Sequence, residues 1–331
     1  MNNFTYCLPE SPLEAANQKM SDPDAQFIAG GTNLVDRLKV FLDQPSQLID
    51  ISNLALQTIE TTADGGLRLG ALATNTAVAQ NKTICHHYPM LARAILSGAS
   101  QQIRNMATVG GNLLQRTRCP YYYDTAFPCN KREPETGCPA IDGMNRNHAI
   151  LGSSDQCVAV HPSDMCVALA ALDAVVEVMS AQGQRQIPFC EFHRLPGNRP
   201  DKDTYLEPGE LITAVTLPHM SKNPSGVYLK IRDRTSYAFA LISVAASVNL
   251  EGDKIEGVRL ALGGVAHKPW RATETEDFLI GKSLDDNILT EAAEIALQDA
   301  KPLSQNQFKV ELAKRAIIRA LKVSAQGGGV V

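Results

Sequence analysis

Four of the chain's eight cysteines crowd into one stretch. These are Cys119, Cys129, Cys138 and Cys157, and the remaining cysteines lie scattered. Four thiolates can complete a [4Fe–4S] cluster or a zinc site. Structural zinc sites usually contain at least one CxxC pair, which is absent here, so the spacing favours a cluster over zinc. The same cysteines could instead form disulfides or stay as free thiols, and Cys166 competes with Cys157 as the fourth ligand.

The four cysteines lie in a segment with no regular pattern. From residue 115 to about residue 157, hydrophobic periodicity disappears and Arg, Pro, Asn, Asp and Gly predominate. A structureless loop of this length is uncommon in a compact domain. Because it has little hydrophobic core of its own, a metal group bound by several side chains would stabilise it most. Pro120 and Pro139 directly follow two of the cysteines and restrict the backbone at those ligands.

Two glycine pairs form the second group of residues suited to chemistry. Residues 29–34 read Ala-Gly-Gly-Thr-Asn-Leu, and residues 108–113 read Thr-Val-Gly-Gly-Asn-Leu. The first run joins a predicted strand to a predicted helix, where free amides and the positive helix end favour an anion. Neither run has the Rossmann or P-loop pattern. A single run is explained most simply as a turn, but two such runs could hold the two phosphates of one dinucleotide.

The elements around these residues predict an α+β fold with two domains. Residues 1–222 form the first domain, with subdomains at about 1–57 and 58–222. Residues 223–325 form a second α+β domain, and residues 326–331 form a flexible tail. Strands are expected at 26–29, 48–51, 67–72, 175–179, 211–217, 226–233, 240–250 and 258–265. Helices are expected at 33–42, 89–99, 162–172, 290–301 and 306–324.

Composition narrows the range of partners. The chain carries 31 basic and 35 acidic residues and has no dense Lys/Arg run, so we expect no nucleic-acid partner. No apolar stretch approaches the ~20 residues that a spanning helix needs, and the first residues lack the apolar centre of a signal peptide. We therefore expect no direct membrane insertion and a cytoplasmic location. No Ser/His/Asp or paired-carboxylate arrangement is recognisable, so no catalytic residue is assigned.

Four motifs together carry a resemblance to a known family. They are the two glycine runs, Pro-Ser-Asp at residues 162–164, and Gly-Gly-Val-Ala-His-Lys-Pro-Trp-Arg at residues 263–271. In these motifs the chain resembles the FAD-binding (medium) subunit of the xanthine dehydrogenase, or molybdenum hydroxylase, family along nearly its whole length. Within that family, Gln-Arg-Thr-Arg-Cys-Pro-Tyr at residues 115–121 and the other three cysteines are most similar to the flavin and [4Fe–4S] subunits of bacterial periplasmic aldehyde oxidoreductases.

The resemblance implies a fold and a set of cofactor contacts. The first domain would be a two-subdomain, PCMH-type FAD-binding domain with a [4Fe–4S] insertion at about 115–157. The second would be a CO-dehydrogenase-flavoprotein-like domain, a small antiparallel sheet with helices. The implied FAD contacts are Phe27, Ile28, Ala29, Gly30, Gly31, Thr32, Asn33, Leu34, Thr108, Gly110, Gly111, Asn112, Leu114, Asp164, Leu211 and Lys230. Of these, Asp164 could instead cap a helix, Leu211 could be strand core, and Lys230 could be solvated.

The resemblance also implies a role in electron transfer. A large molybdenum-cofactor subunit would oxidise aldehydes to carboxylic acids, and a small subunit with two [2Fe–2S] clusters would pass electrons to FAD in this chain. An external acceptor would then receive them. Residues 230–236 depart from the sequence that accompanies NAD use, which argues against NAD as that acceptor. A signal on a partner subunit could take the folded complex to the periplasm. The competing hypotheses are a self-sufficient flavin oxidase or reductase and a non-enzymatic, zinc-binding scaffold.

Overall fold

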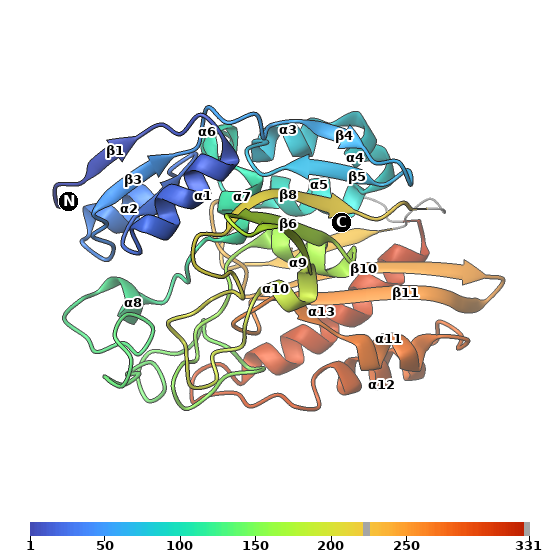
Figure 1. The fold of residues 1–331 in the computed structure, drawn as a ribbon. Helices are drawn as coiled ribbons and strands as arrows, with labels where there is room; N and C mark the ends of the chain where they lie inside the picture. The colour runs from blue at the N-terminus through green and yellow to red at the C-terminus, as the bar shows by residue number, and fades with distance from the viewer. Residues whose placement is uncertain (221–225, 328–331) are drawn as a thin grey trace.

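A computed structural model describes residues 1–220 and 226–327 of the chain. Within these residues, three β-sheets are arranged with helices against them (Figure 1). The predicted boundary between residues 222 and 223 and the tail residues 328–331 lie outside the described residues. In the described parts of the chain, no helix is both long and apolar enough to cross a membrane.

The first sheet is small and parallel, with the strand order β1-β3-β2. Its strands are β1 (Thr5–Cys7), β2 (Gln26–Ile28) and β3 (Gln47–Asp50), and its helices are α1 (Pro12–Ser21) and α2 (Leu34–Lys39). Helix α1 begins where Ser11 accepts the amide hydrogen of Glu14, with proline at the first helical position. Helix α2 ends before residue 42, where we predicted its end, because Phe41 adopts a left-handed conformation with φ of 60°.

The second sheet is antiparallel and has the strand order β4-β5-β8-β6-β7. Its strands are β4 (Ile59–Thr61), β5 (Leu67–Gly70), β6 (Val175–Ser180), β7 (Gly183–Pro188) and β8 (Leu211–Leu217). Strand β8 pairs with β5 on one side and β6 on the other, so it joins segments far apart in the sequence. Buried side chains alternate along β6, as expected of a strand with one face against the core.

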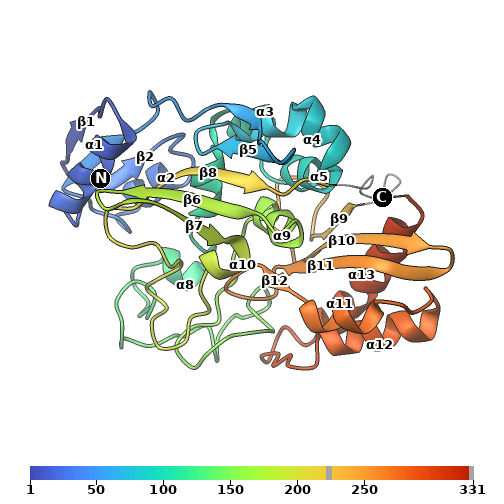
Figure 2. The same ribbon diagram turned by 45° about the vertical axis from the view of Figure 1, so that its right-hand side comes forward.

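Two helices lie at the centre of this second region: α5 (Pro89–Ser97), against which α3 (Asn75–Gln80) and α4 (Lys82–His87) pack, and the apolar helix α9 (Asp164–Ala171), which packs against α5. All residues of α9 from Met165 onward are buried, so it is a central helix and not an amphipathic surface helix. It packs against α5 and against the C-terminal strands β10 and β11 (Figure 2). The other helices are α6 (Gln101–Met106), α7 (Val109–Leu113) and α10 (Phe189–Phe192).

The C-terminal region is a four-stranded antiparallel sheet covered by helices, in the order β12-β11-β10-β9. Its elements are β9 (Val227–Ile231), β10 (Ile242–Glu251), β11 (Lys254–Gly263), β12 (Trp270–Arg271), α11 (Thr273–Leu279), α12 (Asp286–Ala296) and α13 (Phe308–Ala325). Period-two alternation gives the sheet two buried faces. Ala245 and Ala261 belong to the core around α9, whereas Val244 and Leu262 belong to the core under α12 and α13.

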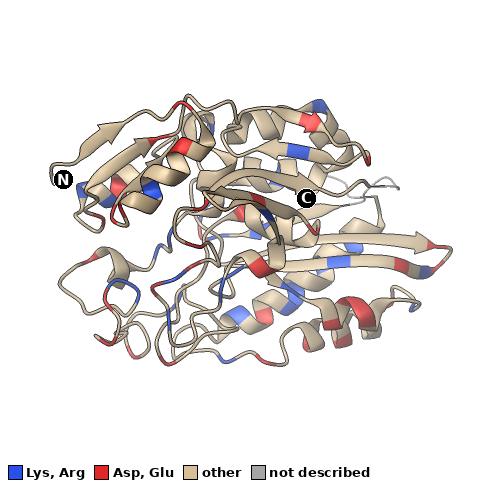
Figure 3. Cartoon of the chain, viewed as in Figure 1, with Lys and Arg blue, Asp and Glu red and all other residues tan. Residues whose placement is uncertain are grey.

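The α+β fold with a small antiparallel C-terminal sheet is as predicted. Several details were wrong, among them the length of α2 given above. The helix predicted at 290–301 is α12, which begins at Asp286 and ends at Ala296, and α11 was not predicted. Between α7 and α9 the chain is irregular apart from α8 (Pro120–Tyr123), as the residue pattern indicated. Figure 3 shows basic and acidic residues close together in this connection.

Candidate functional site

A cavity of about 900 Å³ opens where the first sheet, the second sheet and the C-terminal sheet meet. This volume lies near the upper end of the roughly 300–1,000 Å³ typical of ligand sites. The cavity is lined by every residue predicted to contact FAD: Phe27, Ile28, Ala29, Gly30, Gly31, Thr32, Asn33, Leu34, Thr108, Gly110, Gly111, Asn112, Leu114, Asp164, Leu211 and Lys230. The fold therefore brings these residues together, while their individual contacts with a cofactor stay a prediction.

The first glycine run supplies unoccupied main-chain donors. Among the described residues, no protein acceptor takes the amide hydrogens of Gly30, Gly31, Thr32 or Asn33. Gly31 has a φ of 68°, which side-chain-bearing residues rarely adopt. A Cβ atom on Gly30 would lie 1.8 Å from the carbonyl oxygen of Met106. This run therefore packs directly against the residues that lead into the second glycine run.

The second glycine run is built differently, because it forms the short helix α7. The hydroxyl of Thr108 accepts the amide hydrogen of Gly111 at 3.3 Å and caps the helix. The amide of Gly110 donates to the carbonyl of Ala71 at 2.8 Å. Since these amides are already engaged, this run offers a close backbone approach to a ligand and few free donors.

Two asparagines connect the runs to their surroundings. Asn33 Oδ1 accepts the main-chain N–H of Arg116 at 3.0 Å and a guanidinium N–H of Arg37 at 3.1 Å. Its Nδ2 is buried and has no partner among the described residues. Asn112 Oδ1 accepts the hydroxyl of Ser163 at 2.5 Å, which joins α7 to the start of α9. Because an unpaired buried donor costs about 1–3 kcal/mol, Asn33 Nδ2 is suited to donate to a ligand in the cavity.

Asp164 and Lys230 form a nearly buried ion pair in the cavity wall. Lys230 Nζ donates to Asp164 Oδ2 at 2.7 Å, and the Tyr228 hydroxyl donates to Asp164 Oδ1 at 2.6 Å. Lys230 also donates to the carbonyl of Ser97 at 3.1 Å. Burial raises the pKa of Asp164, although Lys230 opposes that effect. Each carboxylate oxygen thus has a protein donor, and the pair forms a fixed polar surface facing the cavity.

All four predicted metal ligands meet in a second, small pocket. Cys119, Cys129, Cys138 and Cys157 line it together. Burial raises the pKa of the Cys119 thiol to about 12 and that of Cys157 to about 11, and it also raises the pKa of Cys138. Thiols of this kind stay protonated at neutral pH unless a metal displaces the proton.

Main-chain N–H groups surround these sulfur atoms. The amides of Tyr121 and Tyr122 favour the thiolate of Cys119, and the amide of Ala159 favours that of Cys157. Amides of Val158, Ala140 and Ile141 act in the same way on Cys138. Donors directed at sulfur are a recognised means of tuning an iron–sulfur cluster, so the surroundings are suited to metal-bound thiolates.

A network of buried charges lies beside the cysteine pocket. It was not predicted from the sequence. Lys131 is 3% exposed and donates to the carbonyl of Pro200 at 2.9 Å and to Asp203. Arg116 Nε lies 3.0 Å from the other oxygen of Asp203. Burial alone would raise the pKa of Asp203, but Arg116 and Lys131 hold it well below its usual range. Lys131 also lowers the pKa of Cys157, so the network places positive charge close to the cysteines.

His148 connects the cysteine pocket to the C-terminal region. Its Nε2 lies 3.1 Å from Cys119 Sγ, and burial, together with Lys309, lowers its pKa to about 4. The carbonyl of His148 accepts from Lys309 Nζ at 2.8 Å and from Asn306 Nδ2 at 3.2 Å. Lys309 also donates to the carbonyl of Gly264 at 2.6 Å. These roles were not foreseen from the residue pattern, because lysines and asparagines at helix starts are usually exposed.

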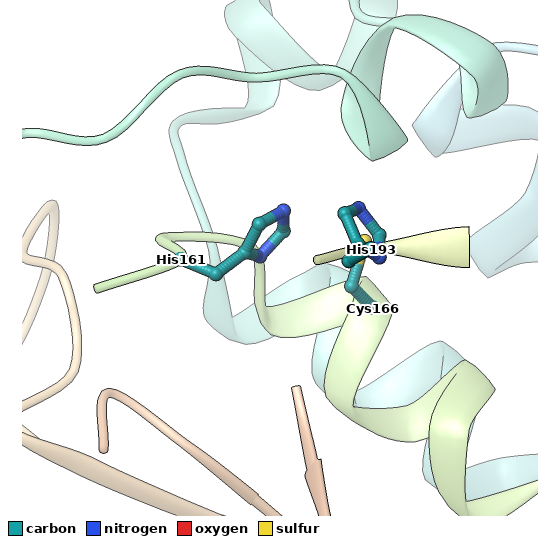
Figure 4. Close-up of side chains that lie close together, drawn as sticks. All are labelled: His161, Cys166 and His193. Atoms are coloured by element: carbon teal, nitrogen blue, oxygen red, sulfur yellow. The ribbon is translucent and has the colours of Figure 1, made fainter. Parts of the chain in front are cut away.

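Cys166, the rival fourth ligand, lies elsewhere. It is buried in α9 beside His161 and His193, as Figure 4 shows. The ligand atoms of these three residues all lie within 4.8 Å of one another. The two imidazoles pack edge to face, and His193 Nε2 lies 2.9 Å from the carbonyl of Leu113. The geometry thus groups Cys157, and not Cys166, with the other three cysteines.

Comparison with known proteins identifies the family. The FAD binding domain of molybdopterin dehydrogenases matches residues 2–220, and the CO dehydrogenase flavoprotein C-terminal domain matches residues 227–323. The chain belongs to the FAD-binding medium subunits of the molybdenum hydroxylase family. This membership confirms the resemblance found in the sequence and the predicted fold class.

Individual members of this medium-subunit family match the chain from end to end. The aldehyde oxidoreductase FAD-binding subunit PaoB of Escherichia coli is 48% identical, over 97% of this chain and 98% of its own length. The glyceraldehyde dehydrogenase medium chain of Sulfolobus acidocaldarius is 27% identical, over 96% and 97%. The crystal structure of quinoline 2-oxidoreductase from Pseudomonas putida 86 has a TM-score of 0.76 at 27% identity and covers 99% of both chains.

Proposed function

We propose that this chain is the FAD- and [4Fe–4S]-containing electron-transfer subunit of a heterotrimeric molybdenum aldehyde oxidoreductase. Its partners would be a large molybdenum-cofactor subunit that oxidises aldehydes to carboxylic acids and a small subunit with two [2Fe–2S] clusters. Electrons would leave the complex for an external acceptor. The observation that carries the proposal is the single cavity lined by both glycine runs, in a chain 48% identical to an aldehyde oxidoreductase FAD-binding subunit.

The residues of the large cavity fit FAD. The free amides from Gly30 to Asn33, together with Asn33 Nδ2, would donate to the diphosphate. Leu114 would lie against the isoalloxazine ring, and the Asp164–Lys230 pair would hold polar atoms at a fixed place beside it. When bound, FAD supplies the exchange between one-electron and two-electron transfer. The chain's part is to hold the cofactor and to set its surroundings.

The residues of the small pocket fit a [4Fe–4S] cluster. The donor set is four cysteines, with main-chain N–H groups and a buried lysine close to the sulfurs. The lack of a CxxC pair, which structural zinc sites usually contain, favours a polynuclear cluster over a single zinc ion.

Co-purification tests the proposal. A tagged chain, expressed with its genomic neighbours, should retain one larger and one smaller partner, and the complex should reduce an artificial acceptor when an aldehyde is added. The isolated chain should bind FAD and oxidise no aldehyde. Aldehyde oxidation by the isolated chain would instead support a self-sufficient flavin enzyme. A chain that holds zinc and no flavin would support the scaffold.

The compartment forms a separate part of the proposal. The resemblance to subunits of periplasmic aldehyde oxidoreductases suggests the periplasm, to which a signal on a partner subunit could export the assembled complex. Cell fractionation with and without the partner subunits tests this. Co-export predicts that the chain appears in the periplasm only when the signal-bearing partner is present.

A further inference from the structure

The two pockets share a wall. Thr117, Cys119 and His148 line both the large cavity and the cysteine pocket. Of the four cysteines, Cys119 is the one that reaches the large cavity. A group held by the cysteines and a cofactor in the large cavity would therefore be separated by the side chains of this wall alone.

His148 occupies a defined position in the wall. The residue is 3% exposed, and its Nε2 lies 3.1 Å from Cys119 Sγ. Its Nδ1 is buried and has no partner among the described residues. A neutral imidazole carries one proton, and in the tautomer protonated at Nε2 that proton faces Cys119 Sγ. The geometry therefore directs an N–H of His148 at the sulfur of Cys119.

The C-terminal helix holds the histidine in place. Asn306 and Lys309, at the start of α13, both donate to the carbonyl oxygen of His148. Lys309 has no exposed surface and also bonds the carbonyl of Gly264. The backbone that carries the imidazole is thus fixed from a different region of the chain by buried polar groups, which stabilise only when they are fully satisfied.

We infer that Cys119 and His148 form the electronic contact between the [4Fe–4S] cluster and FAD, with His148 as a positioning residue that tunes the cluster. The inference rests on the proposed function. In the step, one electron leaves the reduced cluster, which is oxidised, and enters FAD, which is reduced. No bond forms or breaks in the protein. An N–H···S bond favours the more negative, reduced cluster, so His148 raises the cluster's reduction potential.

Redox titration of the assembled complex, followed by electron paramagnetic resonance, tests the inference. His148→Leu removes the donor, and we expect the equilibrium constant for cluster reduction to fall by up to about tenfold, which is ~59 mV for one electron. His148→Gln retains an N–H donor and should restore most of the shift. His87→Leu, at an exposed histidine in α4, is the matched control and should leave the cluster potential unchanged.

A rapid-freeze experiment tests the contact itself. After the wild-type complex is mixed with aldehyde, the reduced-cluster signal should rise and decay within one turnover, and the decay should be slower in His148→Leu. Equal cluster potentials in wild type and His148→Leu, or a cluster that never becomes reduced during turnover, would overturn the inference. A wild-type complex without iron contradicts the proposed function itself, and metal analysis detects that outcome before any titration.

Discussion

The two pockets share a wall but are held together by different forces. The large cavity is formed by strands, helices and a glycine that packs against a neighbouring carbonyl, so its shape follows from regular secondary structure. The cysteine pocket lies in a connection with one short helix, α8, and depends on buried ionic and polar anchors such as Lys131 and Asp203. Removing FAD should therefore leave the large cavity largely intact. Removing the metal group should loosen the cysteine pocket.

The two sites therefore depend on different interactions for their stability. Buried ion pairs add little net stability but become strongly destabilising when one partner is lost. Four thiols in a pocket supply no strong bonds among themselves. The proposed metal group would therefore be needed to fix the irregular connection, whereas the cavity for FAD is stabilised by the hydrophobic cores around it. The following variants separate the two regions.

The largest effect should come from Cys157→Ser. Losing one of four thiolates should abolish the cluster, and with it the iron, the sulfide and the broad absorption near 400 nm. Limited proteolysis should then cut within residues 115–157, while most FAD is retained, because the greater part of the lining of the large cavity comes from outside this connection. Cys85→Ser, at an exposed thiol, is the control.

Cys166→Ser separates the two candidates for the fourth ligand. Since Cys166 lies beside His161 and His193 and away from the other cysteines, this variant should keep its iron. Loss of iron in Cys166→Ser together with retention in Cys157→Ser would reverse the assignment.

Gly30→Ala should weaken FAD binding in the large cavity. The new Cβ would lie 1.8 Å from the Met106 carbonyl oxygen, so the backbone must move and the free amides with it. We expect FAD affinity to fall about 100-fold, which is ~3 kcal/mol, and the cluster to remain. Isothermal titration of the deflavinated chain measures the affinity. Gly257→Ala is the control, because its Cβ would meet Asn249 at an ordinary 3.6 Å. Equal losses in both variants would show that the contact with Met106 is unimportant.

Lys309→Met tests how the irregular connection is anchored. The variant loses the bonds from Nζ to the carbonyls of His148 and Gly264, so we expect a destabilisation of about 1–3 kcal/mol. Urea unfolding followed by the fluorescence of Trp270, the single tryptophan, provides the measurement. Lys314→Met, at a partly exposed lysine on the same helix that pairs with Glu294, should change stability by less than about 1 kcal/mol.

The pH dependence of the Lys309→Met effect has a defined sign. Burial, with a smaller contribution from Arg146, lowers the pKa of Lys309 to about 7 in the folded chain, against ~10.4 when unfolded. Between these values the unfolded chain binds more protons, so the wild type gains stability as pH rises. The difference between wild type and variant should therefore grow from pH 7 toward pH 10. A difference that shrinks over this range would contradict the burial of Lys309.

The smallest effect should come from Asn33→Ala. The variant removes the unpartnered Nδ2 donor that lines the cavity. We expect FAD affinity to fall about tenfold, which corresponds to the ~1.4 kcal/mol of one hydrogen bond. The loss of the Oδ1 acceptor for Arg116 adds to this effect. Asn17→Ala, at an exposed position on α1, should bind FAD like the wild type. Unchanged affinity in Asn33→Ala would remove this residue from the diphosphate site.

The sequence predicted the regular region better than the irregular one. Strand periodicity located β8 at its observed bounds, and the apolar run after Ser163 located α9, because each has a pattern that spacing alone reveals. Helix α2 was predicted too long, because the residue types do not indicate the positive φ of Phe41. Helix α12 was displaced because its start depends on the cap formed by Asp285, which the apolar pattern does not contain.

The residues of the candidate site also fall into two groups, those that the sequence reveals and those that it does not. Glycine pairs and clustered cysteines are recognisable because their residue types carry the chemistry. The partners that position them are not, because Lys131 meets Asp203 and Lys309 meets His148 only through the tertiary fold. Nor could the sequence reveal that the amides of the second glycine run are already engaged, which depends on the carbonyl of Ala71 lying beside Gly110.

The most direct measurement is the cofactor content of the wild-type chain, purified without oxygen and analysed by absorption, flavin extraction and metal analysis. We predict one FAD together with four iron and four sulfide per chain, and no stoichiometric zinc. A chain that folds yet shows no flavin band would contradict the central claim, that the loop from Gly30 to Asn33 and the neighbouring helix α7 enclose a dinucleotide.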